Sequence, residues 1–139
     1  MTEMTGYPFV IHVPVRWRDI DAFRHVNNAA IVSYLEIARS EMWREHFTGS
    51  DPMDIPFVIA RLEVDYKRPI KLYDKVLVGL RPADVGRSSF AFEYLIDVEG
   101  HTAVIARTLQ VCIRHETGRP IRVPKEVSRT LTALAETSR

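Results

Sequence analysis

The chain has 139 residues and a mass of 16.0 kDa, so we expect residues 1–139 to form a single domain. Its 46% hydrophobic and 27% charged residues are ordinary for a globular protein and exclude general disorder. A net charge of +1 argues against nucleic acid as a bulk partner, and the lack of any long apolar run excludes insertion into a membrane. The single cysteine, Cys112, excludes an intramolecular disulfide, and the mixed opening stretch has no export pattern, so we expect a cytoplasmic protein.

The charges are unevenly distributed along the chain. Residues 1–55 carry a net charge of −3, residues 56–101 carry none, and residues 102–139 carry +4. The basic surplus would suit a small phosphorylated ligand, although charges of this kind usually belong to a solvated surface.

The first half of the chain predicts a strand followed by one long helix. Apolar residues alternate with more polar ones over residues 9–18, which is typical of a half-buried strand. From residue 28 the spacing becomes helical, with Ile31, Leu35, Ala38 and Met42 forming the apolar stripe. Asn27 or Asn28 is a natural N-cap, and residues 48–52 should end the helix.

The second half predicts four strands and a short terminal helix. Period-two patterns cover residues 58–67, 76–80, 90–98 and 105–113, with a tight turn at Glu99–Gly100 and another turn over residues 117–120. In the first of these strands, the even-numbered residues from Val58 to Tyr66 should share one face. Residues 124–136 predict the helix. Short connections make these strands antiparallel, so the fold class is α+β, with the long helix packed on the sheet.

A cluster of polar residues lies between the first strand and the long helix. It contains Asp19, Asp21, His25, Asn27 and Asn28. A carboxylate beside the free N–H groups of a helix start can serve acyl transfer, because those donors can stabilise an oxyanion. The same residue types are also common in turns and caps, and composition does not decide between the two interpretations.

The cluster and later segments resemble the 4-hydroxybenzoyl-CoA thioesterase-like branch of the hotdog-fold acyl-CoA thioesterases. The shared pattern is Arg-x-x-Asp-x-Asp-x-x-x-His-Val-Asn-Asn from Arg16 to Asn28, followed by Tyr34, Glu36 and Arg39. Residues 63–70, 73–74, 86–90 and 118–124 also match, so the likeness spans nearly the whole chain. Two departures are Arg24, where many members have glycine, and Ile31, where an aromatic residue is common.

The resemblance implies a hotdog fold, in which a five-stranded antiparallel sheet wraps around one long central helix, with a short C-terminal helix. It implies hydrolysis of an acyl-CoA or acyl-carrier-protein thioester. Asp21 would act as nucleophile or as general base, the Asn28 N–H as oxyanion donor, and His25 as a partner of the thioester or a brace of the loop. The substrate-binding residues that follow from the resemblance are Asn27, Glu36, Lys67, Arg68, Arg87, Ser88 and Ser89.

The remaining expectations concern cofactors, partners and rival functions. We expect no metal and no organic cofactor, because the five histidines and Cys112 have no ligand spacing. Cys112 is expected to be a buried strand residue, and Trp17 and Trp43 are expected to be core or interface residues.

A homodimer or homotetramer is expected, because strand edges and outward apolar residues remain to be covered; the residues expected there are Leu77, Ala91 and Leu95. Two alternatives stay open: a non-catalytic acyl-CoA-binding or sensor subunit, and an enoyl-thioester hydratase on the same fold.

Overall fold

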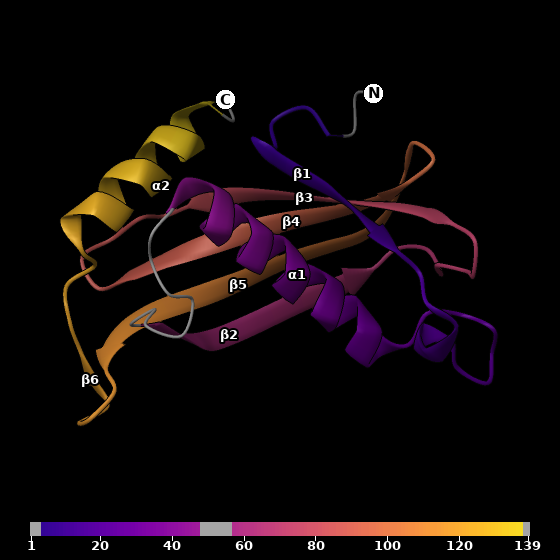
Figure 1. Cartoon of the computed structure of the whole chain (residues 1–139), viewed down its shortest axis with the longest axis horizontal. Helices are drawn as coiled ribbons and strands as arrows, with labels where there is room; N and C mark the ends of the chain where they lie inside the picture. Colours follow the sequence, from indigo (N-terminus) through magenta and orange to yellow (C-terminus); the bar gives the residue numbers. More distant parts are fainter. Residues whose placement is uncertain (1–3, 48–56, 138–139) are drawn as a thin grey trace.

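The computed structural model describes residues 4–47 and 57–137. A six-stranded antiparallel sheet has the order β1-β3-β4-β5-β2, and the short β6 pairs with β5 (Figure 1). The elements in chain order are β1 (Phe9–Pro14), the 3-10 helix η1 (Trp17–Asp19), α1 (Asn28–His46), β2 (Phe57–Tyr66), β3 (Lys75–Ala83), β4 (Ser89–Val98), β5 (His101–Arg114), β6 (Arg119–Pro120) and α2 (Lys125–Thr137). The predicted α+β class is confirmed.

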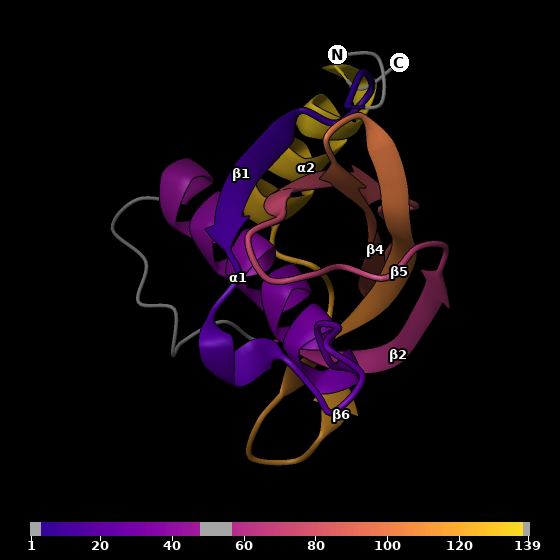
Figure 2. The ribbon, with the colours of Figure 1, turned by 90° about the vertical axis from the view of Figure 1, so that its right-hand side faces the viewer.

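The sheet curves around α1, and the main core lies between them (Figure 2). Alternate residues of β4 point inward and are fully buried, among them Phe92 and Tyr94. Leu35, Ala38 and Met42 of α1 belong to the same core and are also fully buried. The predicted apolar stripe of the long helix is therefore the stripe that is buried. Its predicted end at residues 48–52 lies outside the described residues.

The outer face of the central strands is better covered than the sequence suggests. Ala91 and Leu95 on β4 are buried, so the expectation that they are exposed and wait for a partner is wrong. The reason is partly the N-terminal segment, where Met4 and Tyr7 lie directly over Gly79, the β3 residue paired with Leu95. A side chain at position 79 would collide with them, which explains the glycine.

A group of exposed apolar residues lies instead on β2, one of the two edge strands of the sheet. Its ten residues are nearly all exposed, including Val58, Ile59 and Leu62 at about 40% each. A β-bulge interrupts the pairing of β2 with β5 between Ile59 and Arg61. Val58 and Leu62 therefore lie on opposite faces, and the predicted unbroken alternation along this strand is wrong.

Two further predictions about strands are corrected. The first strand ends at Pro14, and the chain then turns through η1, where Trp17 is 81% exposed and not part of the core. Trp43 on α1 is buried, as expected, and stacks on Phe47. The predicted turn at residues 117–120 includes the two-residue strand β6, because the chain folds back on β5 there.

The C-terminal segment closes the end of the sheet opposite to η1 (Figure 1). Leu131 of α2 is fully buried and belongs to the main core. Cys112 is buried on β5, as predicted. Within the described residues, no helix is both long enough and apolar enough to cross a membrane.

Candidate active site

The loop between β1 and α1 is anchored by the buried carboxylate of Asp19. This group accepts hydrogen bonds from the Tyr34 hydroxyl at 2.7 Å, from the Arg16 N–H at 2.9 Å and from the Arg16 guanidinium at 3.0 Å. Its backbone carbonyl accepts two more, from the backbone N–H and the side-chain amide of Asn27, each at 2.8 Å. Asp19 therefore ties the loop both to the middle of α1 and to its N-cap.

The contacts of Asp19 favour its ionised form. Burial alone raises the pKa of the Asp19 carboxyl, but the hydrogen bonds from Tyr34 and Arg16 more than offset this, so that the pKa lies below its usual value. Burial and the bond to Asp19 raise the pKa of the Tyr34 hydroxyl, which keeps it a donor at neutral pH. With all its contacts satisfied inside the protein, Asp19 is a structural residue.

Asp21 lies two residues further on and is exposed. Its Oδ1 accepts the backbone N–H of Phe23 at 2.9 Å and that of His25 at 3.2 Å. Its backbone N–H donates to the His25 carbonyl at 2.8 Å, which closes a tight loop over residues 21–25. Among the described residues no donor contacts Oδ2. The turn and catalytic interpretations of Asp21 are therefore compatible, because one oxygen holds the loop and the other has no hydrogen-bond donor among the described residues.

The start of α1 supplies free backbone donors beside this carboxylate. Asn27 is the N-cap, and its Oδ1 accepts the N–H of Ala30 at 2.8 Å. Asn28, the first helical residue, is exposed, and its N–H has no protein acceptor within the described part of the chain. Such an N–H can bind an anionic oxygen.

A pocket of about 280 Å³ brings these groups together. Its polar lining consists of Asp21, His25 and Asn28, from the loop and the start of α1, and of Lys67 and Arg68, which follow β2. The apolar lining includes Ile31 from α1, Val104 from β5 and Tyr66 from β2. Both Lys67 and Arg68 are fixed through their backbone N–H groups, which donate to the Ala103 carbonyl at 2.8 and 3.1 Å. The sequence pointed to five polar members of this pocket but not to Tyr66, whose position follows from the course of β2.

Two residues of the predicted site have less definite places. His25 is half-buried and lines the pocket, and the Asp19 carboxylate contacts Arg16 and Tyr34 instead of it. Glu36 is exposed on α1 and does not line this pocket. The predicted roles of His25 and Glu36 therefore stay predictions.

Both departures from the family pattern have visible consequences. Arg24 has a φ of 65°, the left-handed conformation for which glycine is favoured, so the loop keeps its path despite the missing glycine. Ile31 is 3% exposed and lines the apolar part of the pocket. An aliphatic side chain there leaves more room than an aromatic ring would.

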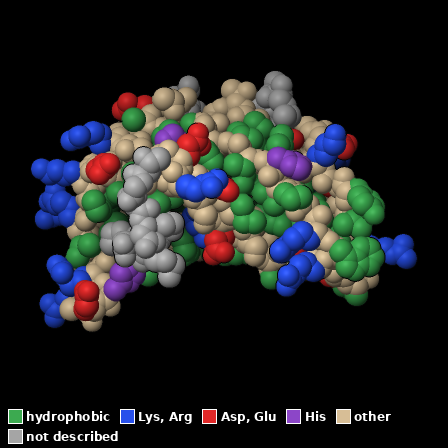
Figure 3. All heavy atoms as spheres, in the orientation of Figure 1, with side chains coloured by type: hydrophobic (Ala, Val, Ile, Leu, Met, Phe, Trp, Pro, Cys, Tyr) green, Lys and Arg blue, Asp and Glu red, His purple; other side chains and the backbone are tan. Residues whose placement is uncertain are grey.

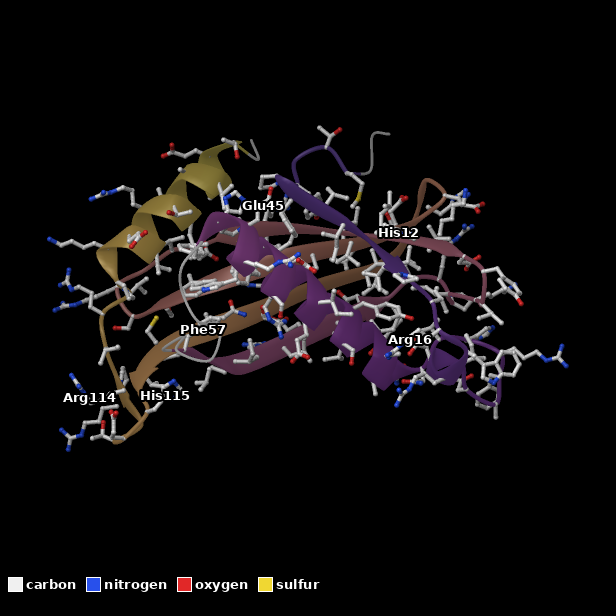
Figure 4. All side chains as sticks on the ribbon, in the orientation of Figure 1. His12, Arg16, Glu45, Phe57, Arg114 and His115 are labelled. Atoms are coloured by element: carbon white, nitrogen blue, oxygen red, sulfur yellow. The ribbon has the colours of Figure 1, made fainter. Side chains whose placement is uncertain are left out.

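Arg87, Ser88 and Ser89 lie far from this pocket. Arg87 and Ser88 precede β4 and Ser89 is its first residue, at the same end of the sheet as Phe57, the first residue of β2. Figure 4 shows Arg16, beside the candidate site, near one end of the molecule and Phe57 and Arg114 toward the other. Within one chain the structure therefore does not bring these three residues to Asp21. Among the described residues, no three histidine, cysteine or acidic side chains are grouped to hold a metal ion.

Comparisons with known proteins show the family to which this chain belongs. Residues 15–131 match the model of the thioesterase-like superfamily. The long-chain acyl-CoA thioesterase FadM of Escherichia coli (strain K12) is 26% identical over 128 residues, covering 89% of this chain and 97% of FadM. The acyl-CoA thioester hydrolase YbgC of Escherichia coli O157:H7 is 27% identical over 119 residues, covering 83% of this chain and 89% of YbgC.

Solved structures show the same fold. A thioesterase from Thermus thermophilus, solved with coenzyme A and zinc, superimposes with a TM-score of 0.86 at 38% identity, covering 96% of this chain and 98% of that one. A predicted thioesterase from Bacillus stearothermophilus gives a TM-score of 0.83 at 24% identity, covering 91% and 95%. By its sequence and its hotdog fold, this chain belongs to the thioesterase-like superfamily of thioester hydrolases.

Proposed function

We propose that this protein hydrolyses acyl-CoA thioesters at the pocket formed by Asp21, His25 and Asn28. The proposal rests on one observation. A single pocket contains a carboxylate oxygen of Asp21 and the backbone N–H of Asn28, and no described residue forms a hydrogen bond with either of them. The acyl group would lie against Ile31 and Val104, the apolar lining. The names of FadM and YbgC support coenzyme A as the carrier.

The chemistry fits a carboxylate without a serine or cysteine nucleophile. A thiolate leaves without much protonation, so no strong general acid is needed. The Asn28 N–H would bind the oxygen of the thioester carbonyl and stabilise the negative charge that develops on it. Asp21 would then either attack the carbonyl carbon to form an anhydride or remove a proton from an attacking water. We favour the water route.

The direct test replaces Asp21 by asparagine. Because an amide neither attacks a carbonyl nor accepts a proton from water, Asp21→Asn should lower kcat at least about a hundredfold while the protein still folds and binds a non-hydrolysable thioester analogue. The measurement is release of free thiol from a panel of short, medium, long and aromatic acyl-CoA thioesters. Asp65→Asn is the matched control, because Asp65 is exposed on β2 and does not line the pocket. A variant with near-parent kcat, its mass checked for deamidation, would rule out the catalytic role of Asp21.

A single turnover in oxygen-18 water separates the two routes. If Asp21 activates water, the label enters the product acid on the first cycle. If an anhydride forms and water then attacks its Asp21 carbonyl carbon, the label enters the Asp21 carboxylate first and is found by mass spectrometry of the peptide that contains it.

We also propose that the protein works as a homodimer joined through β2, or as a homotetramer built from two such dimers. This strand is a sheet edge of ten residues with exposed apolar side chains, a surface that soluble proteins usually cover. Two copies related by a twofold axis would pair their β2 strands antiparallel. The Tyr66 end of one strand, beside the Asp21 pocket, would then lie near the Phe57 end of the other. Residues 87–89 of the partner, which lie at the Phe57 end of its β2, would thus approach the Asp21 pocket of the first copy.

A further inference from the structure

Three aromatic side chains are almost fully exposed at the end of the molecule that carries Asp21. Trp17 in η1 and Phe23 in the loop after it are each 81% exposed, and Tyr73, between β2 and β3, is 89% exposed. We call these three residues the aromatic tip. Single exposed apolar residues are ordinary on a protein surface, but several in one patch indicate an interaction site. Figure 3 shows hydrophobic side chains beside Lys and Arg side chains at the end of the molecule opposite to α2.

Backbone contacts hold the segments of the aromatic tip together. Ile20 pairs with Val26 in an isolated bridge, and the Val26 N–H donates to the Ile70 carbonyl at 2.7 Å. Each aromatic residue of the tip lies three residues along the chain from one of these joined positions, a span of at most about 11 Å. Val26 and Ile70 are buried, so these loops are anchored by aliphatic side chains. The three aromatic rings therefore share one small area without serving the core.

The backbone of Tyr73 gives an independent indication of a role outside the fold. Its φ is 77°, in the left-handed region that a bulky side chain rarely adopts and that glycine adopts without strain. Because 89% of its surface is exposed, the ring gains little from packing within this chain. Strain that packing does not repay points to a function for the exposed ring.

The aromatic tip lies among cations. The two segments that carry it, residues 14–28 and 66–76, contain seven Lys and Arg residues and three Asp residues. The exposed basic residues next to the aromatic rings in sequence are Arg18, Arg24, Lys71 and Lys75. None of these four forms an ion pair with an acidic residue in the described part of the chain. Their charge is therefore available to an anionic partner.

We propose that the aromatic tip attaches the protein to the surface of an anionic lipid bilayer, with the rings among the headgroups and the cations on lipid phosphates. Trp and Tyr are the side chains favoured at a membrane–water interface, because each combines an apolar ring with a polar group. Lysine and arginine beside them are attracted by the negative surface potential of anionic lipid. Protruding rings on separate short segments suit a soft surface better than a partner of fixed shape. Such attachment needs no membrane-spanning helix.

The proposed dimer leaves the aromatic tip accessible. Trp17 follows β1, and Tyr73 comes shortly before β3, so both lie near the edge of the sheet opposite to β2. Two copies joined through β2 would carry one tip at each end of the dimer. A dimer would therefore attach to a flat bilayer by one tip at a time.

Attachment by this tip has a consequence for the Asp21 pocket. The loop over residues 21–25 carries both Phe23 and Asp21, so an attached copy would hold the pocket beside the lipid. An apolar acid released there would enter the bilayer directly. This consequence rests on the proposed function, whereas the attachment itself does not.

The chain contains its own fluorescent probe for the test. Of its two tryptophans, Trp43 is 7% exposed and Trp17 is 81% exposed. With vesicles of equal parts phosphatidylcholine and phosphatidylglycerol, Trp17 emission should shift to shorter wavelength and be quenched by brominated acyl chains. The emission of buried Trp43 should not change. Trp17→Phe should lose this signal but still sediment with the vesicles, because phenylalanine keeps an apolar ring at the tip.

Sedimentation with the same vesicles measures the contribution of the rings. Trp17→Ser/Phe23→Ser should bind at least about tenfold more weakly than the parent, because less apolar surface enters the headgroup region. Val10→Ser/Ile37→Ser is the matched control: these side chains are each 41% exposed between β1 and α1, and their removal should leave binding unchanged.

A second pair of variants measures the contribution of charge. Arg18→Gln/Arg24→Gln should weaken binding to the anionic vesicles about tenfold and make it less sensitive to salt. Arg114→Gln/Arg119→Gln removes the same charge from exposed positions near β6 and should bind like the parent. Vesicles of phosphatidylcholine alone should bind the parent about tenfold more weakly than the anionic ones.

Three results would overturn the proposal. The first is a parent protein that neither sediments with anionic vesicles nor changes its emission when lipid is in large excess. The second is binding that Trp17→Ser/Phe23→Ser leaves unchanged, because another surface would then be responsible. The third is capture of an acidic protein, such as acyl carrier protein, without binding to vesicles, since the tip would then be a protein-docking surface. None of these measurements requires hydrolysis, so they are decided separately from the Asp21 variants that test the proposed function.

Discussion

Asp19 and Asp21 are two residues apart, but their surroundings differ completely. The Asp19 carboxylate is 2% exposed and bound by Tyr34 and Arg16, whereas the Asp21 carboxylate is exposed and has one oxygen that no described donor contacts. A buried, satisfied carboxylate contributes to stability, and an exposed one beside free N–H groups is available for chemistry. We therefore expect Asp19→Asn to reduce stability more than turnover per folded molecule, and Asp21→Asn to do the reverse.

Removing the Tyr34 hydroxyl tests the role of Asp19. Tyr34→Phe should lower the free energy of unfolding at pH 7 by about 2 kcal/mol, the usual effect of losing a buried hydrogen bond to a charged group. Because the pKa of Asp19 is lowered in the folded protein, its contribution is present above the ordinary aspartate value of 3.8 and is lost as the pH falls through the folded value. The difference between parent and variant should thus shrink below about pH 4.

The measurement is urea unfolding between pH 7 and pH 3. Tyr73→Phe is the control, because Tyr73 is 89% exposed, and it should have no effect at any pH. A difference that stayed constant down to pH 3 would contradict the assignment of Asp19 as the charged acceptor.

At the level of elements, the loop over residues 21–25 shows how the site tolerates an unusual residue. Arg24 has a left-handed φ of 65°, which costs a residue with a side chain about 1 kcal/mol relative to glycine. Arg24→Gly should therefore raise the free energy of unfolding by roughly 0.5–1 kcal/mol, less than the full strain because glycine is more flexible when unfolded. Arg18→Gly, at an exposed position in η1, should not stabilise the protein. If Arg24→Gly were instead less stable than the parent, the Arg24 side chain would stabilise the folded protein by more than its left-handed backbone conformation costs.

Much of this element structure could be predicted from the sequence, for identifiable reasons. The helical stripe of α1 and the alternation in β4 are continuous patterns, and the polar loop before α1 carries short side chains that require a turn. The bulge in β2 could not be predicted, because apolar residues occur on both sides of Ala60 and no glycine or proline marks it. The nearness of Arg122 and Arg129 to Arg87 was equally hidden, since both look like surface charges until the chain folds back beside Arg87.

At the level of the whole molecule, the edge strand β2 determines the predicted assembly. Light scattering at micromolar concentration should give at least twice the chain mass of 16.0 kDa. Ile59→Lys/Leu62→Lys should give 16.0 kDa, because lysines on an exposed edge disfavour pairing with a second strand. The monomeric variant should also lose affinity for coenzyme A, since residues 87–89 of the partner would be missing from the site.

A matched control comes from the opposite edge of the sheet. Val10 on β1 is 41% exposed, much like Ile59 and Leu62, and Val10→Lys should leave the mass unchanged. A parent protein of 16.0 kDa would rule out the dimer and, with it, a site shared between copies.

The strand order has a consequence for the time at which the site forms during folding. β3, β4 and β5 are neighbours in both sequence and sheet, whereas β1 pairs with β3 across more than sixty residues, as in the pairing of Phe9 with Leu80. Distant contacts close larger loops and generally form later. On a ribosome, β1 would leave the exit tunnel first and remain unpaired until β3 had been made. Because the loop that carries Asp21 follows β1 directly, the Asp21 pocket should be among the last parts of each newly made chain to take shape.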